Sequence, residues 1–171
     1  MKNSIQFLIV IALSFLSCSK NSSKTSSFQT KSHHKIYQIK QIILIYEDVP
    51  RKKEEDIRNF KATIDSSTIR VKVYNSQKVF HDTTLIPDRN FFTSMCKLID
   101  SLQLEKNAEV FESGCDSGRN YKVRLFDKNH TILLDGYAYY CGKLAAGNLK
   151  GDPRPLFDKL KQVSGFIKLL Q

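Results

Sequence analysis

The chain has 171 residues, a formal charge of +10, 41% hydrophobic residues and four cysteines. This length fits one domain, and the content of large apolar side chains excludes a wholly disordered chain and a membrane protein with several spans. Seven glycines and four prolines exclude collagen-like and proline-rich classes, and four cysteines are too few for a disulfide-dense small scaffold. The positive charge indicates a nucleic-acid partner only if the folded part of the chain carries it.

The chain begins with a short basic segment that is followed by an apolar one. Ile5 to Leu16 is interrupted only by Gln6 and Ser14. A helix of these twelve residues covers roughly 18 Å, which is short of the ~30 Å hydrocarbon core of a bilayer. The pattern is typical of an export signal and predicts a signal peptide over residues 1–17.

Residues 16–19 follow this segment, and Cys18 within them is preceded by a small residue. This arrangement resembles the lipobox of bacterial lipoproteins, and the resemblance covers residues 1–18 only. It implies that the signal is cut before Cys18, which is then diacylated and anchors the protein to a membrane facing the periplasm or the exterior. In some bacteria an aspartate after the cysteine marks inner-membrane retention, so Ser19 favours the outer membrane.

The segment after Cys18 is rich in serine and threonine and shows no periodicity, so we expect a lipidated cysteine and a flexible tether over 18–35. The remaining region 36–171 has 22 basic and 17 acidic residues, a net charge of +5. Half of the positive charge therefore belongs to the signal and the tether, close to an anionic membrane. An exported protein with a mildly basic domain is not expected to bind nucleic acid.

Residues 36–171 are long enough to bury one core, and their patterns predict a single globular α+β domain. The apolar run 42–45 predicts a strand that is covered on both faces. Alternating apolar and polar residues, separated by short polar turns, predict three further strands, over 60–64, 69–73 and 78–86.

Two later segments show apolar residues at helical spacing. The first predicts a helix over about 88–103, with Asp88 as its N-cap. The second predicts a helix over about 153–169, in which Gly165 weakens the last turns. Both helices are expected on one side of the sheet.

The chain between these helices has further strand signals. They predict a short strand at 108–111 and a hairpin with arms at 121–125 and 131–140, followed by a long loop over 141–152. The expected fold class is therefore α+β, with an antiparallel sheet of about six to seven strands, a middle helix and a C-terminal helix.

Three cysteines follow Cys18, so one of them is expected to stay unpaired in an oxidising compartment. Cys115 and Cys141 lie twelve or thirteen positions from the turn of the predicted hairpin, and its antiparallel arms would bring them together. We therefore predict a Cys115–Cys141 disulfide, which stabilises by roughly 3 kcal/mol in the chain-entropy model. Cys96 lies in the middle helix and is expected to be a small buried residue.

The sequence contains no recognisable catalytic constellation. Residues 136–143 have the spacing of a phosphate-binding loop but end in Leu144, where a hydroxyl group is needed. Residues 114–118 contain an Asp-Ser-Gly triplet, and nothing places His81 or His130 beside it. Zinc-ligand spacings are absent as well. We therefore expect that the protein is not an enzyme and that it binds no metal and no cofactor.

Aromatic and basic residues alternate on the predicted hairpin. Tyr137 and Tyr139 share one face of its second strand, and Lys122 and Arg124 share one face of its first. With Arg119 they form a candidate binding patch if the two faces coincide, suited to an envelope glycan, an acidic protein or lipid head groups. In the alternative, the tyrosines belong to the core and the cations are ordinary surface charge.

These features favour a lipid-anchored protein of the cell envelope that acts as a non-catalytic binding or structural module. One alternative is an inhibitor-type lipoprotein that blocks a secreted hydrolase or protease, by analogy with some small envelope lipoproteins. The other is a small envelope hydrolase with a site assembled from dispersed residues. A flat aromatic face would favour the module, a protruding loop the inhibitor, and a deep pocket joining His81 or His130 to a carboxylate the hydrolase.

Overall fold

The computed structural model describes residues 38–49, 58–110, 117–142 and 144–171, and the predicted signal peptide and tether lie outside these ranges. The strands are β1 (Gln41–Val49), β2 (Asn59–Ile64), β3 (Ile69–Tyr74), β4 (Val79–Leu85), β5 (Glu105–Val110), β6 (Gly118–Phe126), β7 (Ile132–Cys141) and β8 (Leu144–Lys150). The helices are α1 (Phe91–Leu102), α2 (Arg154–Lys161) and α3 (Phe166–Leu169). The described strands form one antiparallel sheet in the order β4-β3-β2-β1-β6-β7-β8-β5.

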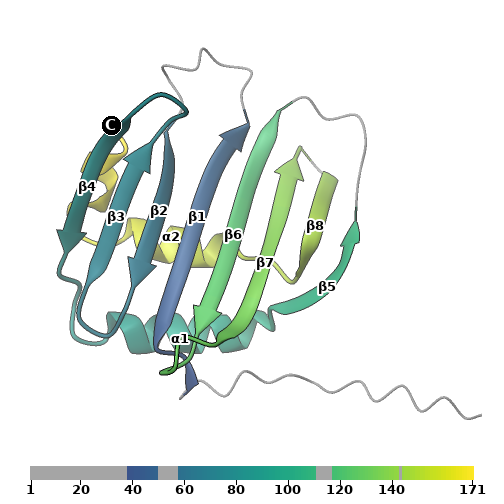
Figure 1. The fold of residues 1–171 in the computed structure, drawn as a ribbon, viewed down its shortest axis with the longest axis horizontal. Helices are drawn as coiled ribbons and strands as arrows, with labels where there is room; N and C mark the ends of the chain where they lie inside the picture. Colours follow the sequence, from purple (N-terminus) through teal and green to yellow (C-terminus); the bar gives the residue numbers. More distant parts are fainter. Residues whose placement is uncertain (1–37, 50–57, 111–116, 143) are drawn as a thin grey trace, which may run out of the picture. The chain divides into compact units, whose positions relative to one another are not determined.

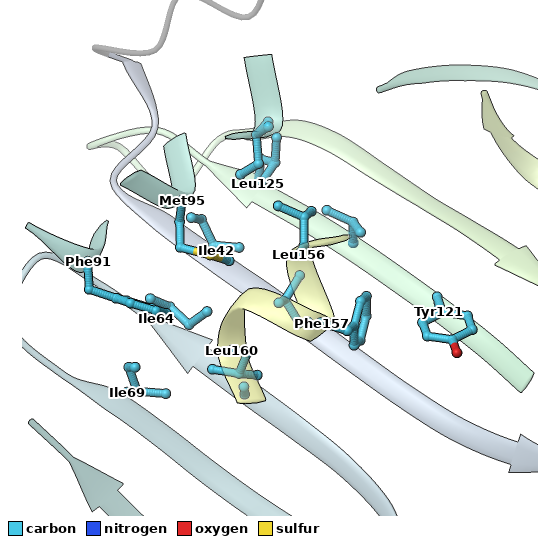
Figure 2. Close-up of a cluster of buried hydrophobic side chains, with 14 of the residues drawn as sticks. Ile42, Ile64, Ile69, Phe91, Met95, Tyr121, Leu125, Leu156, Phe157 and Leu160 are labelled. Carbon is cyan, nitrogen blue, oxygen red and sulfur yellow. The ribbon is translucent and has the colours of Figure 1, made fainter. Parts of the chain in front are cut away.

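The three described helices lie on the same face of the sheet (Figure 1). Alternate residues of the central strands point to the helices, because successive side chains of a strand point to opposite faces. Ile42 of β1 and Leu125 of β6 meet Met95 of α1 and Leu156 of α2 in this layer (Figure 2), and all four side chains are fully buried. The predicted α+β class, with helices on one side of an antiparallel sheet, is confirmed.

Short side chains that accept backbone hydrogen bonds shape the turns between the strands. In the β2–β3 turn, Oδ1 of Asp65 accepts hydrogen bonds from the backbone N–H groups of Ser67 and Thr68, at 2.8 Å each. Asn75 plays the same part in the β3–β4 turn and Asp127 in the β6–β7 turn. Such local bonds depend on neighbouring residues only, which is why the sequence located these turns correctly.

The described helices cover the strand β1 on one face only, contrary to the expectation (Figure 1). Ile42 and Leu44 are fully buried against the helix layer, whereas Ile43 and Ile45 point to the other face and are half-buried. No described helix lies over that second face, which we call the open face. The apolar run 42–45 therefore marks a central strand without marking a sheet that is buried on both sides.

The predicted long loop over 141–152 contains the strand β8, which raises the strand count to eight. β8 pairs with β7 on one side and with β5 on the other. Its first residues include Ala145, Ala146 and Gly147, which lack the alternation of large apolar and polar side chains that identifies a strand. Pairing with β7 and β5 makes this segment extended. β5 also begins earlier than expected, at Glu105.

The helices depart from the sequence expectation at their ends. Gly165 has a φ of 84°, a left-handed conformation that interrupts a helix, so the predicted C-terminal helix is divided into α2 and α3. Asp88 is not the N-cap of α1, because Asn90 holds that position and only the backbone carbonyl of Asp88 accepts a bond from Phe91, at 2.9 Å. Within the described ranges, no helix has the length and apolar character that a bilayer span requires.

Candidate functional site

Four of the five predicted patch residues lie together on the open face. Lys122 of β6 stands directly opposite Tyr137 of β7 in the strand register, and Arg124 stands opposite Asp135. Tyr139 is on the same face as Tyr137, because the two are separated by two positions in one strand. Both tyrosines are half-buried and lie away from the core. We refer to Lys122, Arg124, Tyr137 and Tyr139 as the tyrosine patch.

Arg119 does not belong to the tyrosine patch. It is the cross-strand partner of Tyr140 and points to the face that carries the helices. There it bonds to the Tyr121 side chain, and the neighbouring Tyr46 and Tyr121 side chains raise its pKa. Arg119 and Lys122 are three positions apart, so the two-residue period of a strand places them on opposite faces.

The cations of the tyrosine patch are paired with carboxylates. Nζ of Lys122 lies 2.8 Å from Oε2 of Glu47 on β1, and Nε of Arg124 lies 2.9 Å from Oδ1 of Asp135 on β7. Each pair is at least one-third exposed, so we expect it to contribute at most about 1 kcal/mol to stability. Its larger effect is on the surface potential, because the tyrosine patch becomes balanced in charge and loses the cationic character expected for it.

The two tyrosine rings are held in different ways. The end of the Tyr139 ring lies over Gly118, where an added Cβ atom would stand 2.6 Å from both Cζ and Oη of the tyrosine. A glycine is therefore required for the ring to lie against the backbone of β6. Tyr137 donates a hydrogen bond from its hydroxyl group to Glu109 of β5, and this bond raises the pKa of the tyrosine.

Asn120 of β6 lies beside the tyrosine patch on the open face. Its Nδ2 donates a hydrogen bond of 3.1 Å to Oε2 of Glu47. Because a carboxylate only accepts hydrogen bonds, this contact also fixes which end of the amide is the oxygen. Oδ1 of Asn120 is buried and has no hydrogen-bond partner among the described residues. The open face thus contains a buried acceptor that lacks a donor.

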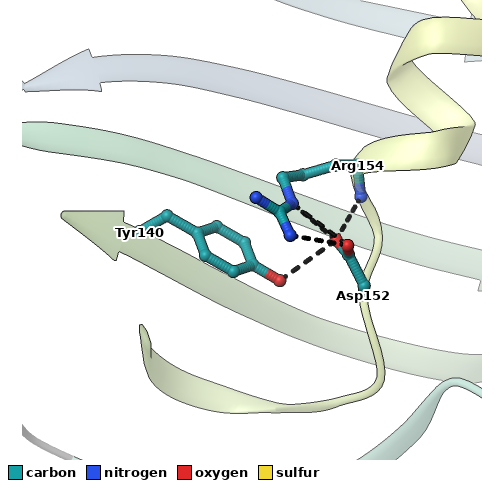
Figure 3. Close-up of polar contacts among 3 residues, drawn as sticks. All are labelled: Tyr140, Asp152 and Arg154. Atoms are coloured by element: carbon teal, nitrogen blue, oxygen red, sulfur yellow. Dashed lines mark hydrogen bonds and ion pairs between the residues drawn. The ribbon is translucent and has the colours of Figure 1, made fainter. Parts of the chain in front are cut away.

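A second polar cluster lies at the start of α2 (Figure 3). Asp152 accepts hydrogen bonds from Nε and Nη2 of Arg154, at 2.9 and 2.8 Å, and from the hydroxyl group of Tyr140, at 3.2 Å. The guanidinium carbon of Arg154 also lies 4.4 Å from the centre of the Tyr140 ring. Burial and the neighbouring Asp152 carboxylate raise the pKa of Tyr140 to about 12. These three side chains form hydrogen bonds with one another and connect β7 to the start of α2.

The stability of the Asp152→Asn variant is expected to fall less than that of the native protein when the pH is lowered. The hydrogen bond from Arg154 lowers the pKa of Asp152 below its ordinary value of 3.8. The carboxylate therefore stabilises the fold above about pH 4, and this contribution is lost as the pH falls through the lower, folded-state pKa. In urea denaturation the variant should be less stable than the native protein by up to about 1 kcal/mol at about pH 5, and the difference should shrink as the pH falls toward about 2.

Asp158→Asn is the matched control for this experiment, because it removes the same charge from an exposed ion pair with Lys161. A difference between native protein and Asp152→Asn that stays constant from about pH 5 to about pH 2 would contradict the prediction.

Neither histidine of the described residues lines the cavity that lies beside α2. His81 is exposed on the edge strand β4, and His130 is exposed in the β6–β7 turn. A cavity of about 290 Å³ lies between the β4–α1 connection and the end of α2, and Asp88 and Lys159 are among the residues that line it. Neither histidine is among them. In the part of the chain that the structure describes, no group of three or more potential ligands is placed to hold a metal.

Two of the cysteines can be described. Cys96 is free and buried in α1, as expected, and burial raises the pKa of its thiol to about 11, which keeps it protonated and unreactive. Cys141 is disulfide-bonded. Cys115 lies outside the described residues, so its pairing with Cys141 stays a prediction. The prediction brought Cys115 and Cys141 together by counting from the turn of the hairpin. An irregularity next to Phe126 shifts the hairpin, so continuing the β6–β7 register places Gly118 opposite Cys141.

Sequence reasoning did not find Glu47, Gly118, Asn120 or Asp135. Their roles depend on which strands are neighbours, and Glu47 is 73 positions away from Asn120 in the chain. The one available signal was Gly118, because a glycine in a strand often marks the close approach of another group.

The open face therefore combines two tyrosine rings, paired charges and a buried acceptor without a donor. Such a surface can stack on the apolar side of a ligand and form hydrogen bonds with its polar rim. No protein-family model, curated protein or solved structure matches this chain.

Proposed function

We propose that the protein is a lipid-anchored binding module of the cell envelope and that its open face holds a glycan. The observation that carries this proposal is the position of Tyr137 and Tyr139 on the face away from the core, among charged side chains that pair with one another. A sugar ring has a flat face of C–H groups and a rim of hydroxyl groups. Tyrosine rings and paired charges offer the complementary apolar surface and hydrogen-bonding groups.

The balance of charge favours a glycan over the other ligands considered for the tyrosine patch. An acidic protein or anionic head groups would be attracted by an excess of positive charge. Here the ammonium group of Lys122 and the guanidinium group of Arg124 each lie within 3 Å of a carboxylate. A ligand that is rich in hydroxyl groups can bond to both members of such pairs without requiring net charge.

The membrane anchor is the second part of the proposal and rests on residues 1–18 alone. Acylation of Cys18 would keep the domain next to the polysaccharides of the envelope, and Ser19 favours the outer membrane. Radiolabelled palmitate should be incorporated into the native protein and not into Cys18→Ala. Equal labelling of the two proteins would contradict the anchor.

The ligand surface is tested with the double variant Tyr137→Ala/Tyr139→Ala. Two stacked rings contribute about 1–3 kcal/mol together, so co-sedimentation of the full chain with the insoluble polysaccharide of bacterial envelopes should weaken by roughly tenfold. Ile167→Ala is the control, because Ile167 is a large, exposed apolar side chain of α3, on the face of the sheet that carries the helices. Equal sedimentation of the double variant and the native protein would overturn the proposal.

A further inference from the structure

The side chain of Asn120 has an arrangement that lowers the stability of the fold, so stability does not explain it. A buried acceptor without a donor costs about 1–3 kcal/mol, because it has lost its bonds to water and gained none in return. Native proteins contain few such groups. Nδ2 of the same side chain is well bonded to Glu47, at 3.1 Å, so the amide cannot turn to satisfy its oxygen without losing this bond.

The neighbours of Asn120 are the groups that a sugar would contact. Its direct cross-strand partners are Glu47 on β1 and Tyr139 on β7. On the next rung of the sheet, Lys122 bonds to the same Glu47 and faces Tyr137. Cross-strand partners have Cβ atoms about 4.5–5.5 Å apart, so these side chains lie within reach of one small ligand.

The ring of Tyr139 can give access to the amide. It lies against Gly118, which has no side chain to hold it. Tyr139 makes no side-chain hydrogen bond with another residue in the described part of the chain. Rotation of the ring away from Gly118 therefore breaks only van der Waals contacts. The same movement would leave the ring standing beside Asn120, where a ligand can stack on it.

We propose that Oδ1 of Asn120 accepts a hydrogen bond from a hydroxyl group of a neutral sugar ring that stacks on Tyr139. This inference rests on the proposed function of the open face. Oδ1 of Asn120 and the carboxylate of Glu47 are both acceptors, so the ligand must supply donors at this point. The cations of the patch are already paired with carboxylates, so no excess of positive charge attracts the carboxylate or sulfate of an acidic sugar. The ligand class is therefore a neutral pyranose polysaccharide.

Asn120→Leu tests the inference, because leucine has a similar size and removes the unsatisfied acceptor. Binding is measured by calorimetry on the full chain with four neutral probes, cellohexaose, maltohexaose, xylohexaose and chitohexaose. We expect the Kd of the best probe to rise by about tenfold, the loss of roughly one hydrogen bond. The midpoint of thermal unfolding should stay equal or rise. A residue with a structural role only would show a lower midpoint and an unchanged Kd.

A second arm tests the charge of the ligand. A β-1,4-linked glucuronic acid hexamer, compared with cellohexaose of the same linkage, should bind at least about tenfold more weakly to the native protein, because its carboxylates would lose hydration at a patch whose cations already pair with Glu47 and Asp135. Equal or tighter binding of the acidic hexamer would overturn the preference for a neutral sugar.

The variants separate failure of this inference from failure of the proposed function. If Asn120→Leu binds the probe like the native protein and Tyr137→Ala/Tyr139→Ala does not, the role of Asn120 is wrong and the glycan-binding face stands. If both variants bind like the native protein, or if none of the four neutral probes binds, both proposals are wrong.

Discussion

Phe60→Ala is expected to lower the free energy of unfolding by about 3–5 kcal/mol. Phe60 is only 2% exposed and lies where the sheet meets the helices. Its ring is stacked on Tyr46 at a centroid distance of 5.5 Å and packs against Phe166 of α3 at 5.2 Å and Phe157 of α2 at 6.0 Å. Truncation removes buried surface and leaves a cavity that this rigid group of rings cannot fill.

Lys61→Ala is the matched control for Phe60→Ala, since the next residue of the same strand is exposed on the open face. Its effect on urea denaturation should stay within about 0.5 kcal/mol. A loss of less than about 1 kcal/mol in Phe60→Ala would contradict the packing argument. The folded fraction of Phe60→Ala should keep the native affinity for glycan, because the cavity lies on the other face of the sheet.

Gly147→Ala is expected to detach the edge of the sheet at a cost of at least about 3 kcal/mol. Gly147 has a φ of 122°, which residues with a side chain rarely adopt, and an added Cβ atom would stand 2.3 Å from the backbone oxygen of Tyr137. The clash involves the backbone of β7, so no side-chain movement relieves it. Because β5 follows β8 at the edge of the sheet, both strands should separate from β7.

Hydrogen exchange detects this separation through faster exchange of the backbone amides of β5 and β8, while β1 and β6 stay protected. Gly142→Ala is the matched control, because Gly142 also has a positive φ, 60°, but has nothing within 4 Å of the added atom. It should cost only about 1–2 kcal/mol, the penalty of a left-handed conformation. Similar exchange in Gly147→Ala and in the native protein would contradict the prediction.

We therefore expect the two faces of the sheet to have separate tasks, packing on one and binding on the other. Substitutions on the helix face, such as Phe60→Ala, are expected to reduce stability and leave ligand binding intact. Substitutions on the open face, such as Tyr137→Ala and Asn120→Leu, are expected to reduce binding and leave stability nearly intact. This separation follows from the alternation of side chains in a strand, and it allows each proposal to be tested without unfolding the protein.

Local patterns were enough to predict a large part of the fold. The hairpin of β2 and β3 follows from a two-residue period and from Asp65, which organises the turn with bonds to its immediate neighbours. The helix α1 follows from apolar residues on one face, although Asp88 is not its cap. The alternation of side chains predicts part of the patch, because it groups Lys122 with Arg124 and Tyr137 with Tyr139, whereas the register between the two strands depends on an irregularity next to Phe126.

Long-range pairing decided the rest. β8 is a strand only because β7 and β5 offer hydrogen-bonding partners, and its small residues carry no strand pattern of their own. The neutral character of the tyrosine patch depends on Glu47, which comes from a strand far away in the chain. Arg119 lies outside the patch because it is three positions from Lys122, and the two-residue period of a strand places it on the opposite face.

By itself, the sequence determined the α+β class, the hairpins and the first helix. It also determined how the positive charge is divided between residues 1–35 and a mildly basic domain, because these features depend on composition and on neighbouring residues. Only the tertiary structure decided which face stays open and which charges cancel, and it alone left Oδ1 of Asn120 buried without a donor. These features depend on the order and register of the strands, and no local pattern encodes which strands become neighbours.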